Sequence, residues 1–168
     1  MKSKFLINRE NNFLKICSNF KHEKISNLIV AHKIKKSLFS ELTKNVKKYL
    51  RKNKKYNFLN RTPNGKLLPK KENQIEFNNV VKSYRNLIMS LGFSKNINKW
   101  VIPSIRYKES KMNPKNLNRS SNSELIHSDV WAGWDSNSIL IQIPIIGDTK
   151  NNRIKYYDIP ENANKKWI

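Results

Sequence analysis

Apolar residues recur at helical intervals in two stretches of this chain. In the first stretch they are Leu38, Phe39, Leu42, Val46, Tyr49 and Leu50, with Lys44, Lys47, Lys48 and Arg51 on the other side. In the second they are Phe77, Val80, Val81, Tyr84, Leu87, Ile88 and Leu91, and Gly92 follows. A spacing of three and four residues places apolar side chains on one face of a helix, and glycine commonly ends one. The pattern therefore predicts two amphipathic helices, the first of them basic and capped by Ser37.

The pattern before residue 37 is weaker. Short apolar clusters in residues 1–21 fit either a short helix or a pair of strands, and both alternatives stay open. In residues 23–36, Ile25, Leu28 and Ile29 have helical spacing, which predicts a further helix. Residues 52–70 lose this periodicity and gather proline, asparagine and glycine, so we expect an exposed connection there.

After Gly92 the apolar spacing changes to the period of two that is typical of strands. Residues 100–107 are predicted to form a strand in which Pro103 requires an edge or bulge position. Residues 138–146 are apolar at nearly every position, which predicts a buried strand. A turn at 147–152 and a third strand at 153–157 complete an antiparallel β-region. The order of the elements predicts an α+β fold with its helices first.

The length and the charge distribution define the predicted organisation. With 168 residues the chain is long enough for one domain with a real core. Residues 1–70 hold 19 basic and 3 acidic side chains, and residues 71–168 hold 15 and 9. We expect a basic, mostly helical N-terminal region at 1–70, and a helix followed by β-structure at 71–168. Because basic side chains attract any polyanion, residues 33–55 are expected to bind polyanions weakly and without sequence preference.

Two absences in the sequence indicate a compartment. Cys17 is the only cysteine, which excludes an intramolecular disulfide and suits a reducing environment. The N-terminus lacks the apolar core of a signal peptide, and no apolar run reaches the length of a membrane span. We therefore expect a cytoplasmic protein without a membrane span.

The stretch that points to chemistry is Glu-Leu-Ile-His-Ser-Asp-Val-Trp-Ala-Gly-Trp at residues 124–134. In an extended strand, residues two apart point to the same side, so the His127 imidazole and the Asp129 carboxylate can bind one metal ion together. A pair this short also fits a plain alternative, a histidine at a strand edge that is hydrogen-bonded to an aspartate. His22 and His32 have no carboxylate two residues away and fit surface or core-edge positions.

The order of these features resembles the first half of the 2-oxoglutarate and Fe(II)-dependent oxygenases. Helices lead into a strand, then His-Ser-Asp with Val-Trp-Ala-Gly behind it, then an apolar strand with Pro144 and a Gly147-Asp148 turn. Within that superfamily the chain is most similar to the phytanoyl-CoA dioxygenase-like and sporadic carbohydrate cluster oxygenase groups. The resemblance covers about residues 76–160 and is sharp over 124–148. It implies N-terminal helices packed on a partial double-stranded β-helix of the jelly-roll or cupin-like kind.

This resemblance implies a dioxygenase with Fe(II) as cofactor, 2-oxoglutarate as co-substrate and a small molecule, from a carbohydrate pathway, as the substrate that is hydroxylated. Such iron sites use two imidazoles and one carboxylate, so His127 and Asp129 match two of the three ligands. Trp131 and Trp134 would wall the cavity. Arg106 would contact the co-substrate or a substrate anion; the alternative for Arg106 is an outward arginine on a strand.

The family's pattern also includes a second histidine and a co-substrate arginine or lysine further downstream. After Asp129 this sequence contains no histidine, and Arg153 comes too early for that role. Three explanations stay open: a truncated or frameshifted oxygenase, a binding module that has lost the chemistry or forms a homodimer through an exposed β-edge, or a third ligand from His22 or His32. We expect the first, because the strand at 138–146 needs partners.

A rival function from another class is nucleic-acid binding without catalysis. Residues 33–55 would contact phosphates, and Tyr49 and Tyr56 would stack on bases. The same basic helix fits a membrane-surface helix, and also an ordinary surface helix that packs its apolar stripe on a core. A non-catalytic β-sandwich is a further alternative.

Overall fold

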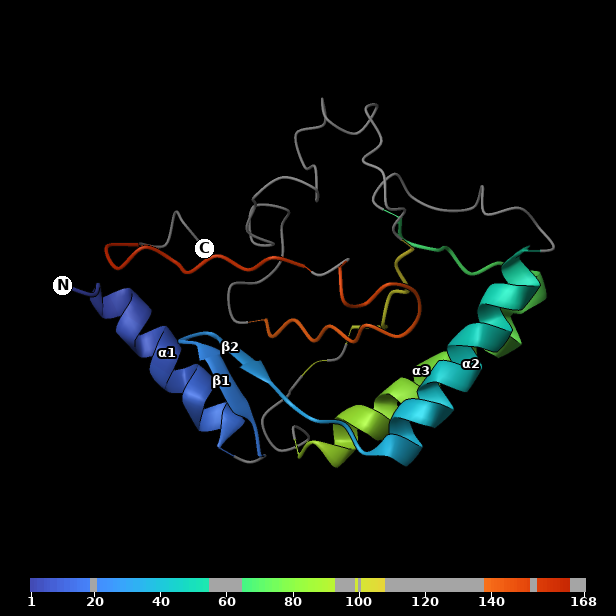
Figure 1. The fold of residues 1–168 in the computed structure, drawn as a ribbon, viewed down its shortest axis with the longest axis horizontal. Helices are drawn as coiled ribbons and strands as arrows, with labels where there is room; N and C mark the ends of the chain where they lie inside the picture. Colours follow the sequence, from blue (N-terminus) through green and yellow to red (C-terminus); the bar gives the residue numbers. More distant parts are fainter. Residues whose placement is uncertain are drawn as a thin grey trace, which may run out of the picture. The chain divides into compact units, whose positions relative to one another are not determined.

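The structure is a computed structural model, shown in Figure 1, and it describes residues 1–18, 21–54, 65–92, 99, 101–107, 138–151 and 154–163. Its elements in chain order are α1 (Lys4–Cys17), β1 (Glu23–Ser26), β2 (Ile29–Ala31), α2 (Lys36–Lys54), the short 3-10 helix η1 (Lys71–Asn73) and α3 (Gln74–Ser90). With helices and a two-stranded antiparallel sheet among the described residues, the arrangement is α+β. The predicted double-stranded β-helix stays a prediction.

The chain divides into two compact units. One comprises residues 1–17, 23–31 and 109–168, and the other comprises residues 18–22 and 32–108. The first unit therefore contains α1, β1 and β2, and the second contains α2, η1 and α3. The division predicted from charge and periodicity, into residues 1–70 and 71–168, was not based on contacts and stays a prediction.

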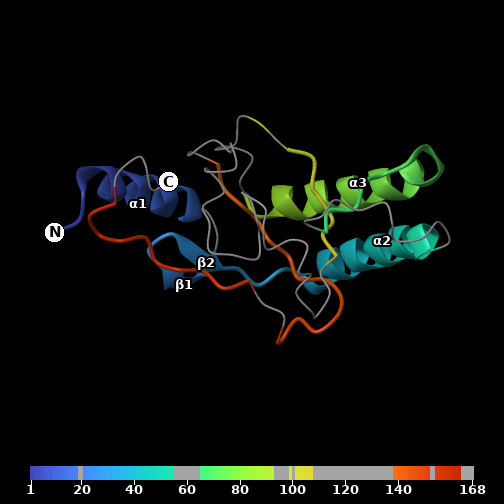
Figure 2. The same ribbon diagram turned by 90° about the horizontal axis from the view of Figure 1, so that it is seen from above.

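In the second unit, α2 and α3 lie side by side, as both views of the ribbon show (Figures 1 and 2). Their apolar stripes face each other because each helix repeats its large side chains every three or four residues. The buried apolar residues of the two helices are Leu42, Val46 and Tyr49 in α2 and Val80, Leu87 and Ile88 in α3, and Leu91 directly after α3 is also buried. Both helices were predicted from this spacing, and both predictions are confirmed. Among the described residues, none of the helices combines the length and the apolar character that a membrane crossing requires.

Three side-chain contacts order the two helices relative to each other. The rings of Tyr49 and Phe77 lie 5.6 Å apart between centroids at an interplanar angle of 54°. Lys52 Nζ lies 3.0 Å from both carboxylate oxygens of Glu76. Asn45 Nδ2 donates to the carbonyl of Asn79 at 3.4 Å. As the residue number rises along α2 it falls along α3, so the helices run antiparallel.

The sequence predicted one end of each helix, the start of α2 and the end of α3, and only the second prediction is confirmed. The prediction that Ser37 caps α2 is wrong: α2 begins at Lys36, and Phe39 N donates to Lys35 O at 3.1 Å, which places Ser37 inside the first turn. At the end of α3, Gly92 has a φ of +76°, the left-handed conformation that favours glycine, so the predicted stop is confirmed.

The helix predicted for residues 23–36 is also wrong, because residues 23–31 form a β-hairpin. Lys24 pairs with Val30 and Ser26 with Ile29, with an irregularity in register between Lys24 and Ser26. The two residues between the strands, Asn27 and Leu28, form the turn. Apolar residues at 25, 28 and 29 satisfy helical spacing, but in so short a segment they fit two brief strands equally well, and β-branched side chains favour strands.

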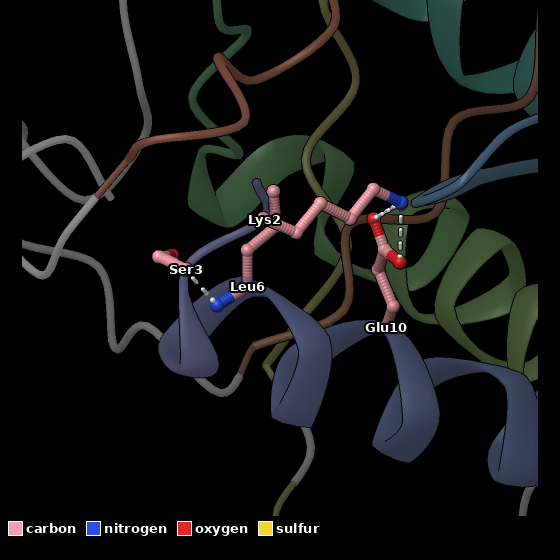
Figure 3. Close-up of polar contacts among 4 residues, drawn as sticks. All are labelled: Lys2, Ser3, Leu6 and Glu10. Atoms are coloured by element: carbon pink, nitrogen blue, oxygen red, sulfur yellow. Dashed lines mark hydrogen bonds and ion pairs between the residues drawn. The ribbon is translucent and has the colours of Figure 1, made fainter.

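The first residues of the chain adopt the helical one of the two alternatives left open by the sequence. Ser3 caps α1: its Oγ accepts a hydrogen bond from Leu6 N at 3.2 Å (Figure 3). The same hydroxyl donates to the carbonyl of Ala163, and Ser3 N donates to Glu161 O at 2.8 Å. Lys2 Nζ contacts both carboxylate oxygens of Glu10, eight residues further along, at 2.9 Å (Figure 3). The start of α1 is thus joined to residues 161–163.

The segment predicted as a buried strand, residues 138–146, is neither buried nor paired in a sheet among the described residues. Its exposure alternates: Ile139, Ile141, Ile143 and Ile145 are half-buried, and the even-numbered residues between them are exposed. Four of the five isoleucines therefore share the half-buried register. The exposed register holds Ser138, Gln142 and Pro144, and also the apolar Leu140 and Ile146.

The chain turns back after this segment, as predicted. Asp148 Oδ1 accepts hydrogen bonds from the backbone N–H of Lys150 at 3.2 Å and of Asn151 at 2.9 Å, and Gly147 has a φ of +97°. Tyr156 OH then donates to Gln142 Oε1 at 2.8 Å. The third predicted strand is wrong for its described part, residues 154–157, which are exposed and form no ladder with the described residues. The side-chain hydrogen bond from Tyr156 to Gln142, and not a strand ladder, joins this segment to residues 138–146.

We predict that Ser3→Ala destabilises the chain by about 1 kcal/mol, because it removes the acceptor for Leu6 N and the donor to Ala163 O. Urea unfolding followed by far-UV circular dichroism measures this loss. Ser40→Ala is the matched control, since Ser40 is exposed within α2 and alanine favours helix. Equal stability of the two variants would contradict the capping role.

We predict that Glu76→Gln destabilises the unit near neutral pH and that the difference shrinks in acid. Lys52 donates to Glu76 and holds the pKa of that carboxyl below its usual value. A lowered folded-state pKa contributes stability that is present above the unfolded pKa and is lost as the pH falls through the folded one. Denaturation at several pH values between about 7 and about 2 measures this. Glu72→Gln, which removes the same charge at an exposed position in η1, is the matched control.

Candidate functional site

The four residues on which the iron prediction depends most, His127, Asp129, Trp131 and Trp134, lie outside the described residues. Their roles as metal ligands and as cavity walls therefore stay predictions. Among the residues that the structure does describe, no three His, Cys, Asp or Glu side chains come together in a way that could hold a metal ion.

Arg106, the residue predicted to bind the co-substrate, lies within the described residues. Residues 101–107 were predicted as part of a strand, but their β-pairing among the described residues is a single antiparallel bridge between Arg106 and Lys66. On either side, Leu67 N donates to Ile105 O at 2.9 Å and Tyr107 N donates to Gly65 O at 2.8 Å. The predicted strand is wrong in extent: Pro103, which lacks an N–H, lies three residues before the bridge.

This hydrogen-bond pattern brings two cations together. The neighbours of Lys66 and Arg106 make the hydrogen bonds, so the two residues form the non-hydrogen-bonded kind of antiparallel pair, in which side chains stand closest. Both residues are exposed, whereas Gly65 and Leu67 beside Lys66 are buried. Like charges directly opposite each other destabilise a pair of strands. An anion placed between them, such as a carboxylate or a phosphate, would relieve that repulsion.

The absence of a side chain at Gly65 allows the two backbone segments of this bridge to come close together. Its φ is +75°, and a Cβ built on it would overlap the backbone carbonyl oxygen of Tyr107. Only glycine allows the chain at residue 65 to approach residue 107 so closely. The sequence signal at this point, proline, asparagine and glycine, predicted a turn, and it did not indicate that Lys66 would lie opposite Arg106.

The histidines that the sequence left as candidates for a third ligand are His22 and His32, both half-buried. The ring Nδ1 of His32 donates to the carbonyl of Lys21. A carbonyl oxygen only accepts hydrogen bonds, so this contact assigns a proton to Nδ1 of the ring.

Cys17 does not have the surroundings of a reactive thiol. Its side chain is buried at the end of α1, and burial raises the pKa of the thiol. Since the thiolate is the reactive form, a raised pKa argues against a nucleophilic role. In the turn at residues 147–151, the two N–H groups and the Asn151 amide that bind Asp148 lower the pKa of its carboxyl. Asp148 is thus occupied in forming the turn.

The basic side of α2 is the largest charged feature of the described residues that the sequence predicted. Lys44, Lys47, Lys48 and Arg51 are all exposed, at positions i, i+3, i+4 and i+7. Tyr49 was predicted to stack on bases, and this prediction is wrong, because Tyr49 is 0% exposed and packs against Phe77. Its ring occupies the apolar stripe. The second predicted stacking residue, Tyr56, lies outside the described residues.

No protein-family model, curated protein or solved structure matches this chain. The functional argument therefore rests on the residues themselves and on their geometry.

We predict that Gly65→Ala destabilises the chain more than Gly147→Ala does. Both glycines have positive φ, so alanine costs about 1–2 kcal/mol of backbone strain at either position. At Gly65 the new methyl also overlaps Tyr107 O, whereas nothing lies within 4 Å of it at Gly147. Urea unfolding of the two variants compares them directly. Equal losses would contradict the close approach at the bridge.

Proposed function

We propose that this chain is an Fe(II)- and 2-oxoglutarate-dependent dioxygenase that hydroxylates a small molecule. The observation that carries the proposal is the tripeptide His127-Ser128-Asp129, followed by Trp131-Ala-Gly-Trp134. In an extended backbone this spacing directs an imidazole and a carboxylate to one side. The proposal includes a double-stranded β-helix as the scaffold and Trp131 and Trp134 as cavity walls.

The donor set fits ferrous iron by its chemistry. A neutral imidazole and a carboxylate are two of the three ligands in the facial triad of non-haem iron oxygenases, and the carboxylate also lowers the net charge of the site. When bound, Fe(II) supplies the activation of dioxygen that cleaves an unactivated C–H bond. His22 and His32 are the other histidines of the sequence, and the proposal leaves both as candidates for the third ligand.

Arg106 is proposed to bind a carboxylate of the co-substrate or a substrate anion. Arg106 is exposed and lies directly across the bridge from Lys66, and a guanidinium can donate two parallel hydrogen bonds to a carboxylate. The pair therefore offers two positive charges and a planar donor. In this role Arg106 fixes the orientation of the anion, and Lys66 adds to the attraction.

We predict that the chain binds Fe(II) and that His127→Ala and Asp129→Asn each weaken this binding at least about tenfold. Anaerobic equilibrium dialysis with Fe(II) alone measures the affinity. Aerobic succinate formation from 2-oxoglutarate measures turnover, which should be lost in the same variants. Asp135→Asn, a carboxylate change nearby in sequence, is the control. His22→Ala and His32→Ala identify the third ligand. Unchanged Fe(II) affinity in His127→Ala would refute the proposal.

A second candidate function, polyanion binding through residues 33–55, is favoured by the exposure of four cations on one side of α2. Because the attraction comes from net charge, such binding weakens steeply as salt is added. It is also indifferent to Fe(II), which separates it from the dioxygenase proposal.

A further inference from the structure

We infer that the cationic face of α2, formed by Lys44, Lys47, Lys48 and Arg51, binds the phosphate backbone of duplex nucleic acid without reading its sequence. The inference rests on the polyanion-binding function proposed above and names its partner. It concerns a surface, and it needs none of the residues of the iron proposal.

The face is regular and continuous. Its four side chains are exposed, and their spacing along the helix places them on one side over about 10 Å, at 1.5 Å per residue. Lys52 lies toward α3 and pairs with Glu76. In the described part of the chain, no carboxylate lies within ion-pair distance of Lys44, Lys47 or Arg51. The face thus presents several positive charges that are not neutralised by direct ion pairs with described carboxylates.

The packing of α2 argues against a membrane as the partner. A helix that binds a membrane surface inserts its apolar side between the lipid headgroups. On α2 that side is already occupied, since Leu42, Val46 and Tyr49 are 1%, 2% and 0% exposed. What remains for a partner is charge without an apolar surface, and this suits a polyanion better than a lipid bilayer.

Two features favour a duplex backbone over single-stranded bases. Binding to single strands depends strongly on aromatic stacking, and Tyr49 is buried against Phe77 and cannot supply it. A duplex carries more phosphate charge per unit length, so an array of cations gains more from it. Because α3 holds α2 along its length, the cations are presented on a packed helix and not on a disordered tail. Arg51 can hold one phosphate with two hydrogen bonds.

The test uses the full chain and a fluorescein-labelled DNA duplex of about 20 base pairs and arbitrary sequence, followed by fluorescence anisotropy from about 50 to about 200 mM salt. One variant combines Lys44→Gln, Lys47→Gln, Lys48→Gln and Arg51→Gln. Its matched control combines Lys24→Gln, Lys82→Gln, Arg85→Gln and Lys155→Gln, which removes the same charge from exposed positions outside α2. Glutamine favours helix, and circular dichroism checks that both variants fold.

We expect the cationic-face variant to bind the duplex at least about tenfold more weakly and to lose about 3–4 from the slope of log affinity against log salt, since each phosphate contact contributes about 0.9. The control should keep most of the affinity and slope. An equal loss in the control would overturn the inference, because binding would then follow net charge. A second duplex sequence should bind equally.

Two other probes separate the failure of the inference from that of the function beneath it. If the chain binds heparin but not the duplex, the nucleic-acid partner is refuted while polyanion binding stands. If it binds neither, both fail. Tighter binding to vesicles containing phosphatidylserine than to the duplex, lost in the cationic-face variant, would replace nucleic acid with a membrane and overturn the inference.

Discussion

The packing of α2 against α3 is the constraint on which the best-defined part of this protein depends. It covers the apolar stripe of α2 with that of α3 and brings Tyr49 against Phe77. Since most of the stability of a helix in a protein comes from the packing of its apolar face, α2 owes much of its order to this contact. The same contact decides the character of the surface: once the apolar side is covered, only the charged side of α2 remains for a partner.

The two long helices could be predicted from the sequence because the apolar repeat of each extends over more than three turns. The hairpin at 23–31 could not, because Ile25, Leu28 and Ile29 satisfy two periods in a segment too short to separate them. Residues 138–146 show a different difficulty. An apolar run indicates burial only if another layer covers it, and sequence alone does not say which side of the run meets that layer.

Some features of the candidate site could likewise be predicted from the sequence, and others could not. His127 and Asp129 could be selected from the sequence, because their spacing is local and strand geometry alone directs both to one side. The juxtaposition of Arg106 with Lys66 could not, since it joins residues 40 positions apart through a bridge that only Gly65 permits. The proton position on His32 likewise follows from a carbonyl eleven residues away. Local spacing indicates which chemistry a chain can hold, and long-range contacts decide what is assembled.

The pairing of Lys66 with Arg106 links stability to binding in a definite direction. Two cations in a close cross-strand pair oppose the bridge by some tenths of a kcal/mol up to about 1 kcal/mol. The hydrogen bonds of Leu67 and Tyr107 offset this repulsion. An anion bound between the two side chains, as proposed, would reverse the sign of that repulsion, so it would bind to the bridged form more tightly than to an opened one. An anion site at Arg106 would therefore order the backbone that forms it.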